Sequence, residues 1–483
     1  MPRLSHAAEA RRDLIQRVLD GEVLLRPVAS ILRPGLSQGN SAPVSYWQLH
    51  IWQHAQLAAR LAPGVNLFNE TITIHRSGDL DVDALQKSLN EIMRRHQAWR
   101  TTFRLFEGEP RQFVSPFIAL PLPVTDLTIL PDPERTHKAH LLGTRDARES
   151  FDLEEGPLVR TRLVRLAAEE WKLFLTVHQI LLDGVSVYSV LLPELVALYE
   201  AFSHHQPSPL PEISIQYPDY AIWQRRSAAI DGYRNSLAYW ELRLKDAPRL
   251  RLPSDYPPPK TRTFRGSIFP FALPARLSAD ALSYSHAQRV TLFTTLSALF
   301  QVLLQRYTGQ EDVVVGTIVP TRPTSELQGL LGYFLNPVAL RLDLTGNPSF
   351  NEVVHRARSV FVEALSNSDV PFDIVAQRVG AQSPAITHPI YQVQVSLEPP
   401  LPSVDRGWSL TPMDFESGGT KLDLYMVFDA RSEGILGRVQ YNPDLYRART
   451  IARMVEHYTL LLDWAVSRPE SRLSDFPQLQ LLS

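Results

Sequence analysis

The sequence of 483 residues contains no cysteine. This excludes disulfide bonds, thiolate metal sites and a cysteine nucleophile, and it fits a reducing compartment. No apolar run approaches the ~20 residues that a membrane-spanning helix needs. The N-terminus has scattered charges and lacks the apolar stretch of a secretory signal. From these absences we expect a cytoplasmic protein that does not associate with membranes.

An excess of charge of either sign is also missing. The 49 basic and 51 acidic residues give a formal net charge of −2, and no segment concentrates one sign. A nucleic-acid binder needs a basic stripe to neutralise phosphates, so the charge pattern argues against this class of protein. The hydrophobic share of 44% is ordinary for a globular protein. Because the chain is too long for one compact core, we expect two domains or lobes.

Several common catalytic signatures are absent as well. The sequence has no G-x-S-x-G nucleophile elbow, no phosphate-binding G-x-x-x-x-G-K-[ST] loop, no G-x-G-x-x-G and no H-E-x-x-H. His204 and His205 are adjacent beside a proline-rich turn, which favours a solvated pair over a metal site. Four tryptophans in apolar runs are predicted to belong to the core, at positions 47, 52, 99 and 223.

What is present is an alternation of strand and helix patterns. Apolar residues with a helical period, and short runs rich in β-branched residues, predict the elements. Strands are expected over 67–76, 159–166, 171–179, 312–320 and 390–398, and helices over 81–97, 186–202, 291–307, 349–365 and 450–466.

Proline-rich stretches divide this pattern. A short amphipathic helix over 5–20 and a linker over 33–43 precede the globular part, which is expected to begin near Val44. The pattern restarts after the proline-rich residues 204–220. We therefore predict three parts in an α/β protein: an N-terminal helix and linker (1–43), an N-terminal lobe (44–215) and a C-terminal lobe (216–483).

The segment "HQILLDG" (178–184) lies where a predicted strand meets a predicted helix. Gly184 would permit a backbone conformation that other residues avoid, and amides at the start of the helix could stabilise an oxyanion. Ser186 is a plausible N-cap, and Pro193 predicts either a kink or a regular helix that starts only near it. Taken alone, the spacing favours a structural interpretation, with a buried His178 that is hydrogen-bonded locally and an Asp183 that caps the helix.

Several further segments follow in a fixed order. They are "SYWQLHIW" (45–52), "RHQAWRTTF" (95–103), "FDLEEGPLVR" (151–160), "HQILLDG" (178–184), "YPDYAIWQ" (217–224), residues 316–341, "DVPFDIV" (369–375) and "HPIYQVQVSL" (388–397). With these motifs, from about residue 45 to 483, the chain resembles the condensation domain of nonribosomal peptide synthetases. The last motif keeps only its latter half.

The resemblance implies two lobes like chloramphenicol acetyltransferase, packed in a V around a central tunnel. It implies an amide-forming acyltransferase of secondary-metabolite biosynthesis. An upstream donor and a downstream acceptor peptidyl carrier protein would dock at opposite mouths of the tunnel, beside an adjacent adenylation domain. Their phosphopantetheine arms would deliver the substrates, and the domain itself would bind no cofactor and no metal. The excised domain is expected to be a monomer.

The resemblance also implies roles for single residues. The family credits catalysis to the second histidine of its His-His-x-x-x-Asp-Gly motif, and Gln179 stands at that position here. His178 would be mainly structural, and Gly184 would let the pantetheine arm pass. Asp183 would pair with an arginine, with Arg100 and Arg322 both left as candidates. The residues expected in the substrate tunnel are Val185, Ser186, Asn336, Pro337 and Gln392.

Gln179 leaves several alternatives open, because an amide cannot act as a general base, a role typically worth ~10²–10⁴ in rate. The domain condenses by positioning its substrates, with Gln179 as a hydrogen-bonding substitute. Alternatively it is a docking platform for carriers or for a tailoring enzyme, or the glutamine was introduced to trap a complex. A more distant hypothesis is a free-standing acyltransferase that uses a soluble amine or alcohol. We favour condensation by positioning.

Overall fold

The computed structural model describes residues 40–229, 233–380, 390–399, 407–412 and 415–479. The helix predicted over 5–20 and the linker up to residue 39 lie outside the described residues. Described structure begins with β1 (Ser41–Pro43), close to the predicted start of the globular part at Val44.

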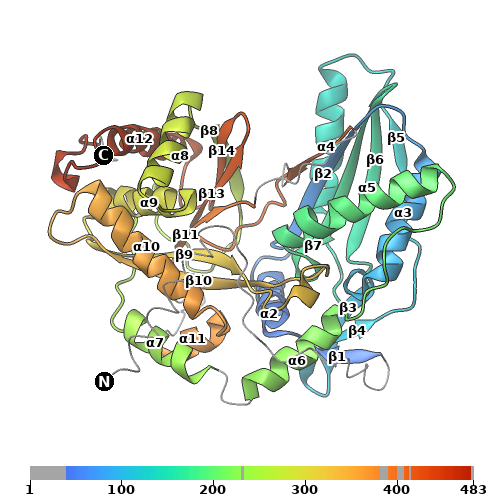
Figure 1. The fold of residues 1–483 in the computed structure, drawn as a ribbon, viewed down its shortest axis with the longest axis horizontal. Helices are drawn as coiled ribbons and strands as arrows, with labels where there is room; N and C mark the ends of the chain where they lie inside the picture. The colour runs from blue at the N-terminus through green and yellow to red at the C-terminus, as the bar shows by residue number, and fades with distance from the viewer. Residues whose placement is uncertain (1–39, 230–232, 381–389, 400–406, 413–414, 480–483) are drawn as a thin grey trace.

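A mixed five-stranded sheet forms the centre of the N-terminal lobe, with strand order β12-β2-β7-β6-β5 among the described residues. Its elements are β2 (Asn69–Ser77), α3 (Val82–Arg95), β5 (Val124–Asp126), α4 (Glu134–Arg148), β6 (Val159–Ala167), β7 (Glu170–His178) and α5 (Leu192–Ser203). Side chains alternate along β7, so Leu173 and Leu175 join the core beneath α3 and α5, whereas Phe174 joins a smaller core beneath α4. Helices therefore cover both faces of this sheet (Figure 1).

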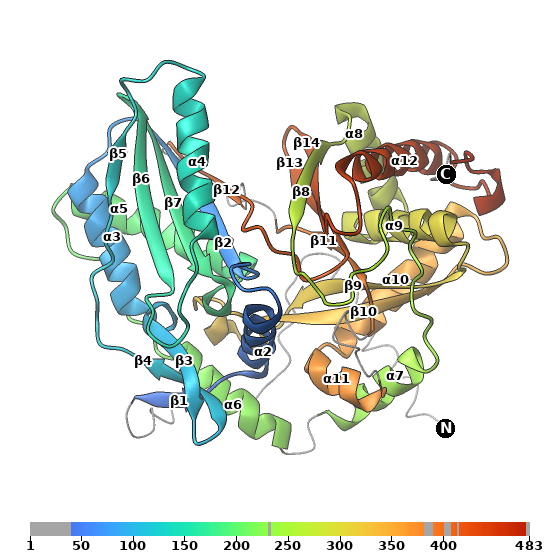
Figure 2. The same ribbon diagram turned by 180° about the vertical axis from the view of Figure 1, so that it is seen from behind.

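A small second sheet completes this lobe, with strand order β1-β4-β3. The elements around it are α2 (Tyr46–Leu61), the short helix η1 (Gln97–Arg100), β3 (Thr101–Phe106), β4 (Glu109–Val114) and α6 (Tyr217–Ala229). In α2, Ser45 and Gln48 form a capping box, which fixes the start of a helix that lies between the two lobes (Figure 2).

The C-terminal lobe is built on a mixed six-stranded sheet, with strand order β10-β9-β11-β13-β14-β8 in the described part of the chain. Its strands are β8 (Ser267–Ala272), β9 (Asp312–Pro320), β10 (Leu335–Asp343), β11 (Val393–Leu397), β13 (Leu424–Arg431) and β14 (Gly434–Tyr441). Its helices are α7 (Arg234–Leu244), α8 (Ala275–Ala287), α9 (Leu292–Thr308), α10 (Phe350–Ser366), α11 (Phe372–Arg378) and α12 (Ala448–Ser467), with two short turns, η4 (Ser325–Leu327) and η5 (Leu473–Asp475).

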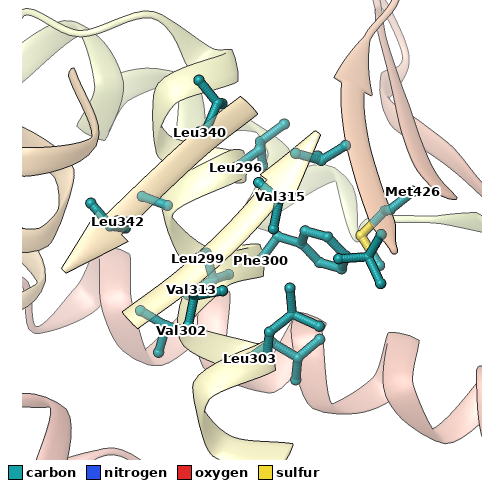
Figure 3. Packing of buried hydrophobic residues seen from close by; sticks show 14 of the residues in the cluster. Leu296, Leu299, Phe300, Val302, Leu303, Val313, Val315, Leu340, Leu342 and Met426 are labelled. Atoms are coloured by element: carbon teal, nitrogen blue, oxygen red, sulfur yellow. The ribbon is translucent and has the colours of Figure 1, made fainter. Parts of the chain in front are cut away.

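The core of this lobe lies between α9 and the sheet. Leu296, Leu299 and Phe300 of α9 are fully buried and pack against Val313 and Val315 of β9 (Figure 3). Thr291 caps the start of α9 with its side chain, and Gly309 ends the helix in a left-handed conformation. The apolar face that predicted this helix is therefore the one that is buried.

One strand crosses from the second half of the chain to the first lobe. Strand β12 (Trp408–Pro412) pairs antiparallel with β2, with Trp408 opposite Arg76 and Leu410 opposite Ile74. Tyr217 and Tyr220 of α6 also belong to the core of the N-terminal lobe. These two segments follow residue 216 in the sequence but pack with the N-terminal lobe, so one cut at 215/216 does not separate the lobes completely. The predicted domain boundaries stay a prediction.

The two lobes meet near α2 and diverge from there, so the molecule is V-shaped (Figure 1). The prediction of two α/β lobes is confirmed, and each strand and helix expected within the described residues is present. Of the four tryptophans, Trp47 and Trp99 are fully buried and Trp52 and Trp223 are packed against the same core.

Two remaining features concern the surface and the helices. His204 and His205 are exposed, as expected for a solvated pair. Across the described ranges, no single helix is long and apolar enough to cross a membrane. Helices α8 and α9 reach that length and composition only as a pair, bent by 108° at their break.

Candidate active site

The turn after β7 holds the predicted motif. His178 ends the strand, Gln179–Leu181 form the short turn η2, and a helix begins at Gly184. It runs first through the π-helical stretch η3 (Ser186–Leu191) and becomes α-helical at Leu192. Pro193 stands in the first turn of α5, so the prediction that the regular helix starts only near this proline is confirmed.

Asp183 caps this helix. Its Oδ1 accepts a hydrogen bond from the Ser186 amide at 2.7 Å, and its Oδ2 accepts one from the Phe334 amide at 2.9 Å. The prediction of Ser186 as the N-cap is therefore wrong, because the aspartate three residues earlier takes that role. The Ser186 hydroxyl instead donates to the Gly332 carbonyl at 2.9 Å.

Gly184 has no unusual backbone conformation. It is not among the described residues with positive φ, and it lies in helical backbone. A Cβ at this position would meet Tyr188 at 3.5 Å and Pro399 at 3.8 Å, which are ordinary contacts. The turn therefore makes no use of the backbone freedom that a glycine permits, and the role of Gly184 beside the pantetheine arm stays a prediction.

Arg322 is the arginine that pairs with Asp183. Its Nη2 donates to Asp183 Oδ1 at 3.1 Å and to the Ser186 hydroxyl at 2.8 Å, and both charged side chains are almost completely buried. The guanidinium also lies 4.1 Å from the centre of the Phe334 ring. Arg100 instead donates to the carbonyl of Ser115 at 2.7 Å. The buried charges are offset by these hydrogen bonds, so the pair ties the start of the helix to the loop before β10.

His178 is enclosed by apolar rings. Its Nδ1 accepts a hydrogen bond from the Ile180 amide at 3.3 Å, and the rings of Phe68 and Phe151 lie 5.8 and 6.4 Å away. Burial lowers the pKa of His178 to about 3, and the positive charge of Lys421 acts in the same direction. The imidazole is therefore neutral around pH 7 and fits a structural role.

Gln179 faces the cavity between the lobes. The backbone N–H of Gln179 donates to the backbone carbonyl of Phe68 at 2.8 Å, which fixes the main chain. The side chain of Gln179 lines the cavity and reaches the C-terminal lobe. There the Nζ of Lys421 donates a hydrogen bond to the side-chain Oε1 of Gln179. Lys421 precedes β13, so this contact joins the motif in one lobe to a residue of the other.

Lys421 is a site residue that the sequence did not indicate. Its ammonium lies 4.6 Å from the centre of the Phe68 ring, and burial lowers its pKa while the charge of Glu70 opposes that change. Burial raises the pKa of Glu70. A lysine before a strand has no local signature, and only the meeting of the two lobes brings it to Gln179.

The cavity is lined by both lobes. The N-terminal lobe contributes His50, His54, Phe68, Glu70 and Gln179, and the C-terminal lobe contributes Tyr333, Pro337, Tyr391, Gln394, Lys421 and Arg438, among others. At its edge, His50 Nδ1 and a carboxylate oxygen of Asp373 are 3.0 Å apart, which links α2 to α11 across the lobes. Arg438 pairs with Glu398 at 2.7 Å. The cavity thus has polar and charged groups on both sides.

The other predicted tunnel residues have distinct positions. Asn336 donates to the carbonyls of Ser368 and Val370 at 2.8 and 2.7 Å and so fixes the loop before α11. Gln392 lines a second cavity, in which its Oε1 accepts the Leu250 amide at 3.1 Å. Val185 is partly exposed beside Gly184. Of the five, Pro337 lines the cavity that contains Gln179, and the tunnel assignment of the others stays a prediction.

Three of the sequence motifs meet beneath this site. The hydroxyls of Ser45 and Tyr217 are 2.9 Å apart, and Tyr217 also donates to the carbonyl of Tyr333. The indole of Trp47 donates to the Tyr220 hydroxyl at 2.8 Å. Segments that are far apart in the sequence therefore form one hydrogen-bonded support for the turn and the loop that carries Phe334.

Comparison with known proteins gives a consistent result. Residues 38–480 match the family model described as "Condensation domain". The chain is 36% identical over 442 residues to a linear gramicidin synthase of Brevibacillus parabrevis, covering 90% of this chain and 8% of that protein. It is 36% identical over 451 residues to chondramide synthase cmdD of Chondromyces crocatus, covering 92% of this chain and 11% of that protein. The chain thus spans about a tenth of the length of these relatives.

Solved structures share the fold. The X-domain from teicoplanin biosynthesis has a TM-score of 0.79 at 24% identity, covering 93% of this chain and all of that one. The first condensation domain of the CDA synthetase has a TM-score of 0.79 at 20% identity, covering 91% of this chain and 99% of that one. The predicted two-lobed fold like chloramphenicol acetyltransferase is confirmed at this level.

Proposed function

Because the chain belongs to the condensation domain family, we propose that it forms an amide bond between two carrier-bound substrates in nonribosomal peptide synthesis. The amine of the acceptor's aminoacyl group attacks the thioester carbonyl of the upstream acyl or peptidyl group. The substrates arrive on phosphopantetheine arms of a donor and an acceptor carrier protein, and an adenylation domain loads the acceptor. Nothing in this reaction requires a cofactor held by the domain itself.

The observation that carries the proposal is the position of Gln179. Its side chain faces a cavity whose walls come from both lobes, at the turn where the family motif lies. A cavity shared by two lobes suits a reaction between two substrates that enter from different sides. Holding an amine and a thioester in line contributes a large share of catalysis without proton transfer to the protein.

A second candidate function follows from the same residue. Gln179 is an amide where the motif has a histidine, so the domain would serve as a docking platform that holds carriers or a tailoring enzyme without forming the bond. The remaining contacts favour condensation, because the Asp183–Arg322 pair and its hydrogen bonds keep the turn in shape.

One experiment separates the two functions. Donor and acceptor carriers are loaded chemically, and the dipeptide thioester is quantified by mass spectrometry with the unmodified protein and with Gln179→His. We expect turnover by both, within about tenfold of each other, because positioning supplies most of the rate. The control is Gln206→His, which changes an exposed glutamine.

The other outcomes are equally informative. Turnover that appears only in Gln179→His would favour the platform. No turnover by either protein would contradict condensation of these substrates. Turnover without an acceptor carrier, with a soluble amine, would favour a free-standing acyltransferase.

A further inference from the structure

The contact between Lys421 and Gln179 determines which end of the amide faces the cavity. A lysine ammonium carries three donors and no acceptor. The group of Gln179 that the ammonium binds must therefore be an acceptor, which is the side-chain oxygen Oε1. The structure has this hydrogen bond, from Lys421 Nζ to Gln179 Oε1. The amide nitrogen Nε2 is consequently turned away from Lys421.

The amide nitrogen is available to a ligand. Among the described residues, no protein group accepts a hydrogen bond from Gln179 Nε2, and this atom is not one of the enclosed side-chain atoms that lack a partner. Since Gln179 lines the cavity, its NH₂ group is open to that cavity. The structure thus presents a hydrogen-bond donor where the family motif has an imidazole.

Positive charge lies behind this donor. The Lys421 ammonium is held by Gln179 Oε1 and by the face of the Phe68 ring, with Glu70 nearby on β2. An amide whose oxygen binds a cation is polarised and donates more strongly through its nitrogen. The second cation of the cavity, Arg438, forms an ion pair with Glu398.

We infer that Lys421 holds Gln179 as a hydrogen-bond donor to the oxyanion of the tetrahedral intermediate. This inference rests on the proposed condensation and specifies how it proceeds. Gln179 acts on the carbonyl oxygen of the thioester, and Lys421 is a positioning residue that acts through Gln179. Preorganised donors aimed at a developing oxyanion are among the largest contributions to acyl transfer.

The chemical step balances without a base in the protein. The neutral acceptor amine forms the C–N bond, and the carbonyl oxygen takes the negative charge. The negative charge on this oxygen then re-forms the C=O bond, the C–S bond breaks, and the thiolate of the donor's pantetheine leaves. The extra proton on the new nitrogen passes to that thiolate, so an amide and a thiol are formed and no proton passes through Gln179.

The first test replaces the donor and keeps the shape. Gln179→Glu retains the contact with Lys421 but has an oxygen in place of Nε2. We expect kcat to fall by about 10²–10³, with KM for both carriers unchanged, as for loss of an oxyanion donor. If Gln179 instead accepted the proton of the amine, the carboxylate would match or exceed the glutamine, and this result would overturn the inference.

The second test addresses Lys421. We expect Lys421→Met to lower kcat about tenfold without changing KM, because the amide loses its fixed orientation. Lys421→Arg should restore most of the rate, since a guanidinium also donates to Oε1, and Lys260→Met serves as the control at an exposed lysine. In a Gln179→Met background, Lys421→Met should have no further effect. An equal loss in that background would show that Lys421 acts by another route.

A binding experiment separates this inference from the proposed function. The probe is a phosphonamidate analogue of the tetrahedral intermediate with a pantetheine arm, compared by calorimetry with the neutral amide of the same length. The unmodified protein should bind the anionic analogue about tenfold or more tightly than Gln179→Met does, while both bind the neutral amide equally. Equal affinities for the anionic analogue would overturn the inference. Discrimination without turnover would instead overturn condensation and show that Gln179 donates to an anionic group in the cavity.

Discussion

His178 and Gln179 are adjacent in the chain but lie in opposite environments. The imidazole is surrounded by the rings of Phe68 and Phe151, whereas the glutamine reaches the cavity and meets Lys421. The imidazole of His178 is therefore kept neutral, and the side chain in the reactive position, Gln179, does not titrate. The chemistry around residue 179 depends on hydrogen-bond direction rather than on a proton.

The neutral state of His178 predicts a pH dependence of stability. Its pKa is about 3 in the folded protein, against 6.5 in an unfolded chain. As the pH falls below 6.5, the unfolded state binds a proton that the folded state does not bind until about pH 3, so stability falls with pH across this window. His178→Asn keeps an acceptor for the Ile180 amide and removes the titration.

We therefore expect the free energy of unfolding to fall less in His178→Asn than in the unmodified protein between about pH 6.5 and about pH 4. The difference between the two falls should be a few kcal/mol. Urea denaturation at several pH values measures this difference. The control is His205→Asn, because His205 is exposed and its φ of 57° suits asparagine. Equal pH slopes for His178→Asn and the unmodified protein would contradict a neutral, buried His178.

Single residues differ in how far the sequence reveals them. The position of Gln179 follows from the motif, and the scaffold role of His178 agrees with its burial. The choice between Arg100 and Arg322 needed the fold, since both lie in motifs and only distance in space separates them. Lys421 has no motif around it in a single sequence, so its contact with Gln179 could not be predicted.

At the scale of elements, Asp183 is the point where the helix after β7 meets the loop before β10. The carboxylate accepts from Ser186 at the start of the helix, from Phe334 in the loop and from Arg322. Two of these three donors, Arg322 and Phe334, lie about 140–150 residues further along the chain. The loop and the helix hold each other in place.

Breaking this junction is expected to affect stability more than chemistry. Arg322→Met leaves Asp183 buried without its counter-charge and should lower the free energy of unfolding by about 3–5 kcal/mol. Arg100→Met, which removes a hydrogen bond to the Ser115 carbonyl, is the matched control and should lower it by only about 1–2 kcal/mol.

Chemical denaturation measures both changes. The combined Asp183→Asn and Arg322→Met variant should lose less stability than the sum of the two single losses, because the partners are coupled. A loss in Arg322→Met no larger than that in Arg100→Met would show that the pair does not hold the junction.

Most elements could be predicted from local patterns. Strand β9 occupies the residues expected for it, and α10 and α12 differ from their predicted ranges by two residues or fewer at each end. The N-cap at Ser186 was wrong, because serine and aspartate are both good caps and only the position of Phe334 and Arg322 favours Asp183. Strand β12 was missed, since five residues that end in proline carry no clear period.

Within the part of the chain that the structure describes, each lobe has one large core, and the second half of the chain contributes β12 to the first lobe's central sheet. Trp408 anchors this strand. Its ring is buried, lies 5.1 Å from the ring of Tyr199 and contacts the guanidinium of Arg76 at 5.3 Å. The integrity of the N-terminal lobe therefore depends on a residue in the second half of the sequence.

This dependence predicts that Trp408→Ala destabilises the N-terminal lobe selectively. Removing a buried tryptophan should lower the stability of that lobe by about 3–5 kcal/mol. We expect calorimetry to show an early transition, and limited proteolysis with mass spectrometry to place the first cuts before residue 216. The control is Trp464→Ala, which alters the core of the other lobe. Cuts that begin in the C-terminal lobe in both variants would contradict the assignment.

The resemblance to condensation domains implied the arrangement of the two lobes, but it did not show which late segment pairs with the first sheet. Hydrophobic periodicity depends on the environment of neighbouring residues. The pairing of β12 with β2 depends instead on which exposed sheet edge a distant segment reaches in the folded chain. The same limit applies to the cavity, whose lining comes from positions scattered from His50 to Gln440.

The crossing of β12 also has a consequence for the order in which the protein can be made. Strand β2 pairs with β7 on one side, and its other side stays an open edge until Trp408–Pro412 have left the ribosome. About 330 residues separate these strands, so at ~5–20 residues per second the edge waits for tens of seconds. Exposed strand edges recruit other chains. The nascent protein therefore passes through a period in which its first lobe is translated but cannot close, and this is when it most needs a chaperone.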